Sequence, residues 1–124
     1  MATQDLINFG VTRAGNEVLE ELKEDGLIAE WLDGYHFAVA LALRLDLPPA
    51  DDKLNYRGST WNVGSIDTTL AEILQVLRPE CKTEPYRYMQ RLAESGLNEI
   101  QKRKETGQLR WENLLASPLN DVGS

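Results

Sequence analysis

Residues 35–43 read YHFAVALAL, a nearly continuous apolar run inside the longer stretch 28–45. Period-3.6 spacing across 28–45 predicts a helix. One face of that helix would hold Ile28, Trp31, Leu32, Tyr35, Val39 and Ala42, and the opposite side would hold Phe37, Ala40 and Leu41. A helix that is apolar on all sides is normally buried on all sides. In a chain of 124 residues, a subunit interface is one way to cover both faces.

Three other segments, 13–25, 66–78 and 84–106, have the apolar spacing of amphipathic helices. Thr12, Ser65 or Asp67, and Thr83 precede them as N-cap candidates, and Gly26 and Gly107 follow the first and the last. The residues expected to face inward are Val18, Leu19 and Leu22; Leu70, Ile73, Leu74 and Leu77; and Tyr88, Met89, Leu92, Ala93, Leu97 and Ile100.

A short strand is predicted over Leu6–Thr12, where Ile7, Phe9 and Val11 alternate with less apolar residues. A lone strand must pair, and the same strand of a second copy is one candidate. A strand followed by two helices also matches the ribbon-helix-helix plan, in which paired strands bind base edges in the major groove. The outward positions of this strand, Asn8, Gly10 and Thr12, carry no basic residue, which argues against operator binding unless Arg13 contributes.

The fold class predicted for residues 1–124 is a mainly α single compact domain of four to five helices with a short N-terminal strand. Residues 108–115 are the candidate for a last short helix, and residues 116–124 for a flexible tail. Gly96 lies in the apolar arc of the last long helix, where glycine costs about 1 kcal/mol, so close approach of another backbone would compensate. Candidate contacts between copies are Phe9, Phe37, Leu41 and Gly96.

Residues 46–65 form a long connection after Pro48-Pro49, and long loops often carry function. Within it, Asn55 and Arg57 are candidate binding residues, because arginine offers a rigid fork of donors to carboxylate or phosphate. An arginine that fastens the loop to its own domain is an equally good explanation. Asp51-Asp52 supplies too few ligands for a divalent cation and favours a solvated turn.

Charge divides the chain. The net charge is −7, with 11 acidic and 3 basic residues in 1–52 against 9 and 10 in the remainder. Acidity disfavours general electrostatic binding to nucleic acid or anionic lipid. On the last long helix, Arg87, Arg91, Asn98 and Lys102 share a face that could meet phosphates, although Glu94 and Glu105 dilute it. Arg87 and Arg91 are therefore further candidate binding residues, and an exposed face with local ion pairs is the alternative.

No catalytic constellation is visible in the sequence. His36 and Cys81 are the only histidine and cysteine, so we expect no enzyme activity, no metal and no cofactor. The single cysteine fits a reducing, cytoplasmic setting. Neither a signal peptide nor an apolar run long enough to span a membrane is present in the sequence, and we expect no membrane association.

Several stretches resemble the small E subunit of Dnd-type DNA phosphorothioation systems. They are Ile7-Asn8-Phe9, Leu19-Glu20-Glu21-Leu22-Lys23, Asp25-Gly26-Leu27, the run 37–43, the loop 51–57, and Gly64 before Ile66-Asp67. The resemblance implies a small, mainly helical, oligomeric accessory subunit whose family binds duplex DNA, nicked duplex in particular, through lysines near the first helix. This chain has one basic residue, Lys23, between residues 14 and 43, so direct DNA contact stays open.

We therefore expect a non-catalytic, homo-oligomeric accessory subunit that acts by binding within a DNA-modification complex, together with protein partners of that complex. The alternative is an acidic adaptor that docks on a basic protein and has no contact with nucleic acid.

Overall fold

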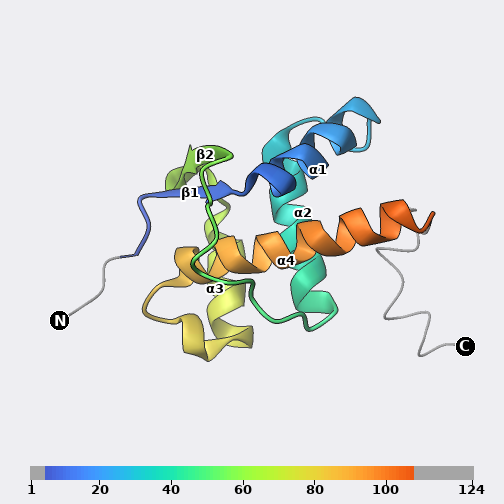
Figure 1. Cartoon of the computed structure of the whole chain (residues 1–124). Helices are drawn as coiled ribbons and strands as arrows, with labels where there is room; N and C mark the ends of the chain where they lie inside the picture. The colour runs from blue at the N-terminus through green and yellow to red at the C-terminus, as the bar shows by residue number, and fades with distance from the viewer. Residues whose placement is uncertain (1–4, 108–124) are drawn as a thin grey trace, which may run out of the picture.

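Four α-helices and a two-stranded sheet make up residues 5–107, the part of the chain that the computed structural model describes (Figure 1). In chain order they are β1 (Asn8–Val11), α1 (Arg13–Glu24), α2 (Trp31–Arg44), β2 (Ser59–Asn62), α3 (Thr68–Leu77) and α4 (Pro85–Glu105), with the 3-10 turns η1 (Val63–Ser65) and η2 (Pro79–Cys81). The mainly α class with a short N-terminal strand is confirmed. The short helix predicted at 108–115 and the tail at 116–124 lie outside the described residues.

The centre of the fold is the crossing of α2 and α4 (Figure 1). All six residues predicted for the inner arc of α4 are buried. At the crossing, a Cβ added to Gly96 would lie 2.0 Å from the carbonyl oxygen of Ala38. Gly96 thus permits the close backbone approach that the sequence predicted, but the approaching backbone belongs to the same chain.

The apolar run in α2 is covered from several directions within one chain, by α4, by α1 and by the sheet. The ring of Phe9 lies 4.5 Å from that of Tyr35, and both side chains are fully buried. Phe9, Leu41 and Gly96, three of the residues predicted to contact a second copy, are buried within the one chain and offer little surface for such a contact. Phe37 packs on the core with part of its surface still exposed.

Strand β1 pairs antiparallel with β2 of the same chain, with Asn8 opposite Asn62 and Val11 opposite Ser59. Pairing with the strand of a second copy is thus wrong as a prediction, and β2 lies inside the segment predicted as a long connection. The strand–helix–helix order of the ribbon-helix-helix plan is present, but the ribbon forms within one chain. Gly10, predicted to point outward, is buried beneath the loop that contains Tyr56.

Most helix ends follow local signals. Thr12 and Asp67 cap α1 and α3 by accepting hydrogen bonds from Gly15 N–H and Thr69 N–H, as predicted. Gly26 and Gly107 end α1 and α4 with φ angles of 75° and 74°. The predicted cap of α4 is wrong, because the helix starts at Pro85 after Glu84 rather than after Thr83.

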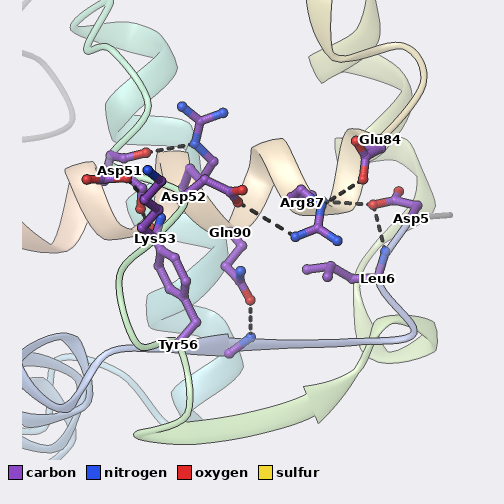
Figure 2. A network of polar contacts seen from close by, with 12 residues as sticks. Asp5, Leu6, Asp51, Asp52, Lys53, Tyr56, Glu84, Arg87 and Gln90 are labelled. Atoms are coloured by element: carbon purple, nitrogen blue, oxygen red, sulfur yellow. Dashed lines mark hydrogen bonds and ion pairs between the residues drawn. The ribbon is translucent and has the colours of Figure 1, made fainter. Parts of the chain in front are cut away.

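A distant residue supplies the missing cap of α4. The carboxylate of Asp5 accepts a hydrogen bond from the backbone N–H of Arg87 at 3.0 Å (Figure 2), and a second from the backbone N–H of Tyr86 at 2.9 Å. A carboxylate at this position satisfies unpaired donors and favours the positive end of the helix dipole. The first described residue of the chain is therefore fixed to the start of its last described helix.

Helix α3 buries less than its apolar pattern predicted. Leu74 and Ala71 are buried, but Ile73 and Leu77, expected to face inward, are 46% and 57% exposed. Val76 is 77% exposed beside them. The described part of the chain thus presents an apolar stripe of three side chains on α3.

We expect Gly96→Ala to destabilise the protein. A new methyl group would overlap the Ala38 carbonyl, and overpacking of this kind costs about 1–3 kcal/mol, which opposes the gain of about 1 kcal/mol in helix propensity. The measurement is urea unfolding monitored by circular dichroism. Asn98→Ala, at an exposed position of the same helix, is the control and is expected to leave stability unchanged or slightly raised. Equal stability of the two variants would contradict the close crossing.

Candidate binding site

The segment that follows α2 lies across the first half of α4 and is bonded to it. Arg91 Nε donates a 2.7 Å hydrogen bond to the carbonyl of Ala50, and Ala50 N–H donates back to the carbonyl of Arg91. Ser95 Oγ donates to the carbonyl of Pro48 at 2.6 Å. Arg91 therefore fastens the loop to its own domain, the alternative role that the sequence left open for Arg57.

Arg87 has a similar role. Its Nε donates to Glu84 at 2.7 Å, and its Nη1 lies 3.7 Å from the carboxylate of Asp52 (Figure 2). The hydrogen bond to Glu84 raises the pKa of the Arg87 guanidinium. The predicted basic stripe on α4 is accordingly interrupted, because the loop lies over Arg91 while Asn98 and Lys102 stay exposed.

Tyr56 anchors the same loop from the other side. Its ring is buried, and its hydroxyl donates a 2.7 Å hydrogen bond to the carbonyl of Asp51. Burial raises the pKa of Tyr56 to about 12. The Asp51 carboxylate accepts from Lys53 N–H while Asp52 faces Arg87, so this acidic pair is engaged within the loop. Residues 5–107 contain no group of three or more His, Cys, Asp or Glu placed to hold a metal ion.

Asn55 and Arg57 differ from the two arginines of α4. Both are exposed, and within the described residues neither side chain has a hydrogen bond or an ion pair. Gly58 N–H donates to the carbonyl of Val11 at 2.8 Å, which holds this end of the loop beside the start of α1. The loop thus presents Asn55 and Arg57 at fixed positions with their polar ends free.

Two hollows of about 600 and 660 Å³ adjoin at these residues and share Leu54, Asn55 and Arg57 as lining. Arg87 lines the first hollow and Arg13 lines the second. We call the two hollows together the arginine groove. Of the four predicted binding residues, the structure brings Asn55, Arg57 and Arg87 together here, whereas Arg91 lines neither hollow.

The arginine groove is positively charged in an acidic chain. Its lining contains three arginines and one carboxylate, that of Asp52, while the whole chain has a net charge of −7. The side chain of Arg13 is 94% exposed, and its nearest ion-pair partner, Glu17, is 3.9 Å away. The groove therefore offers cationic donors that internal ion pairs satisfy only in part, an arrangement suited to an anion.

Two buried polar residues of α4 hold the sheet in place, and sequence reasoning missed both. Gln90 Oε1 accepts a 2.7 Å hydrogen bond from Gly10 N–H (Figure 2), and both carboxylate oxygens of Glu94 lie 2.9 Å from the hydroxyl of Thr12. Glu94, predicted on an exposed face, is only 3% exposed. The only sequence signal of this pair is the i, i+4 spacing of the two residues. Polar residues on exposed helix faces have the same spacing, so the signal does not indicate burial.

Burial raises the pKa of the Glu94 carboxyl group, and the hydrogen bonds from Thr12 oppose this change. The carboxyl group contacts the N-cap of α1, so its protonation state bears on the junction between β1 and α1.

The acidic face of α1 is partly neutralised within the chain. Lys104, near the end of α4, pairs with Glu21 and lies 3.4 Å from Asp25. Glu17, Glu20 and Glu24 remain exposed. Acidic residues of the first half of the sequence thus form ion pairs with a basic residue of the second half, and these pairs join α1 to α4.

His36 and Cys81 lie in positions that favour structural roles. Burial lowers the pKa of His36, although Asp67 and Asp33 oppose the shift, and its Nε2 has no hydrogen-bond partner among residues 5–107. Cys81 is buried, and burial raises the pKa of its thiol, which keeps it protonated.

None of the helices within residues 5–107 has the length and apolarity needed to cross a bilayer. Comparison with known proteins gives no match: no family model fits the chain, and no curated protein or solved structure is detectably similar to it.

We expect Glu94→Gln to change the pH dependence of stability. Because the folded-state pKa of Glu94 is raised, the contribution of this group is greatest below the pKa of the unfolded chain and is lost as the pH rises through the folded-state value. Glutamine does not ionise, so the stability of the variant relative to the parent should increase between about pH 4 and pH 7. Urea unfolding across this range measures the difference, and a constant difference would contradict the assignment.

Proposed function

We propose that this protein is a non-catalytic binding subunit whose arginine groove receives phosphate groups of a nucleic-acid backbone. The observation that supports this proposal most directly is Arg57, whose exposed guanidinium has no partner within residues 5–107 and lines two hollows that are positive while the chain is acidic. Arginine binds phosphate through paired, charge-assisted hydrogen bonds. The amide of Asn55 adds an uncharged donor at the same place.

The groove suits a linear polyanion better than a single ion. Its two hollows lie on either side of Arg57, with Arg13 on one side and Arg87 on the other. Successive phosphates of one strand would then meet successive guanidinium groups. Contacts of this kind position a protein on nucleic acid without reading its sequence.

This function is of the same kind as the one that the resemblance to the Dnd E subunit implies, namely binding to DNA. The residues that would contact the DNA are different. Under the proposal the chain is an accessory subunit of a DNA-modification complex. The family's contact residues are lysines near the first helix, whereas here the cations would come from the start of α1, the loop and α4. The exposed carboxylates of α1 would repel the nucleic-acid backbone from the rest of that helix.

Arg57→Gln is expected to weaken binding to a fluorescein-labelled duplex in an anisotropy titration. Loss of one phosphate contact should lower the affinity about three- to tenfold and reduce the slope of log K against log salt by about 1. The titration uses intact and nicked duplexes. Lys82→Gln removes the same charge from an exposed turn outside the arginine groove and should have little effect. Equal losses in both variants, or no salt-dependent binding at all, would contradict the proposal.

We further propose that the subunit self-associates through α3. Its exposed stripe of Ile73, Val76 and Leu77 lies on a helix with one charged residue, Glu72, so two copies related by a two-fold axis can meet with little charge to bury. We propose this α3 surface as the contact between copies in place of the residues of β1, α2 and α4 that the sequence suggested for that role.

Val76→Glu should reduce the mass measured by light scattering at micromolar concentration towards that of the monomer. Val76 is 77% exposed, so the substitution leaves the core intact while it places a charge in the stripe. Asn98→Glu adds the same charge at an exposed site on α4 and should leave the mass unchanged. A parent protein that is monomeric under these conditions would refute self-association.

The acidic adaptor remains the second candidate, and the exposed side chains of Glu17, Glu20 and Glu24 on α1 favour it. A gel shift with nicked and intact duplex, run beside a pull-down with a basic protein, separates the two functions. A salt-sensitive shift supports the nucleic-acid subunit, and recovery of the protein without a shift supports the adaptor.

A further inference from the structure

A third hollow, of about 470 Å³, lies where the end of α1, the start of α2 and strand β2 meet. Two indole rings, those of Trp31 and Trp61, form part of its wall together with Leu32. None of its lining residues belongs to the arginine groove. We call it the tryptophan hollow.

The two indoles stand at right angles, with ring centroids 6.4 Å apart. The position of the Trp61 ring is fixed on one side, because the ring stacks on the buried ring of Phe9 with the two centroids 5.3 Å apart. A perpendicular pair of aromatic rings offers a cation a ring face on one side and a second aromatic wall on the other. One of the two walls is therefore rigid before any ligand arrives.

A cation already lies at this site. The ammonium nitrogen of Lys23 lies over the ring of Trp31, 5.6 Å from its centroid. The face of Trp31 is thus accessible to a charged group and is favourable to it. Lys23 is itself exposed and reaches the ring from the last turn of α1, so another cation can displace it.

The charges around the tryptophan hollow favour a cationic ligand. Glu30 and Asp33 line it, both are exposed, and they outnumber Lys23. At the start of α2, Glu30 N–H donates a 3.1 Å hydrogen bond to the Asp33 carboxylate, which fixes where that carboxylate lies. The surrounding half of the sequence, residues 1–52, is strongly acidic.

We infer that the tryptophan hollow is a docking site for an arginine or lysine side chain on a basic segment of a partner protein. The alkyl stem of that side chain would lie along the indole of Trp61, and its charged end would lie between Trp31 and the carboxylates of Glu30 and Asp33. This inference goes beyond the nucleic-acid function, because it needs a second ligand of opposite charge at a separate site.

The test is an anisotropy titration of the full-length protein with a fluorescein-labelled pentapeptide of alternating glycine and arginine, capped at both ends. Citrulline replaces arginine in one control peptide and proline replaces it in another. We expect saturable binding of the arginine peptide, and Trp31→Ala should weaken it about fivefold while Trp31→Phe retains most of the affinity.

Lys23→Gln gives the sharper result. If Lys23 competes for the face of Trp31, its removal should tighten binding of the arginine peptide about threefold. Lys82→Gln, which changes the net charge equally at a distant exposed turn, should leave the affinity unchanged. Circular dichroism verifies that every variant is folded.

Three outcomes would overturn the inference. Binding of the citrulline or proline peptide as tightly as the arginine peptide would indicate an apolar groove rather than a cation site. Equal effects of Lys23→Gln and Lys82→Gln would indicate attraction by net charge alone. A change in oligomer mass on Trp31→Ala would indicate that a second copy covers the hollow. Arg57→Gln should leave peptide binding unchanged, so failure here and failure of the nucleic-acid function are distinguishable.

Discussion

The contact between Gly96 and the backbone of Ala38 is the constraint on which the rest of this structure depends. It brings α4 against α2 so closely that no side chain fits between the two backbones at the crossing. The large side chains on either side of the crossing then fill the core, where both helices bury apolar surface. Everything that α4 holds in place takes its position from this contact.

What α4 holds in place includes both the sheet and the candidate binding surface. Gln90 and Glu94 bond to the strand β1 and its junction with α1, while Arg87 and Arg91 bond to the loop. The amide, the carboxylate and the two guanidinium groups of this one helix thus hold the strand β1, its junction with α1, and the loop in place. The loop backbone that carries Arg57 takes its position from these bonds and from the bond of Gly58 N–H to Val11.

The sequence alone predicted the helices well, because periodicity and caps such as Thr12 are local properties. It missed β2, whose four residues give too short a pattern, and it missed the cap from Asp5, which is 81 residues from Tyr86. Gly96 is the most instructive case: the need for a close backbone was predictable, but the identity of that backbone is a tertiary property. For the same reason, the sequence could not show that Arg91 is hydrogen-bonded to the loop, whereas the side chain of Arg57 has no such partner within residues 5–107.

The distant bonds of the N-terminal segment also constrain the order of events during synthesis. Asp5, β1 and Thr12 find their partners at residues 59–62 and 86–94, so β1 cannot pair until β2 has been made, and the bonds to α4 cannot form until that helix follows. β1 is therefore made before both of its partners, β2 and α4, and carries unpaired backbone groups until they have been made. A chain that stops before α4 would lack Gln90, whose amide binds Gly10 N–H, and would leave that backbone donor of β1 open to other chains.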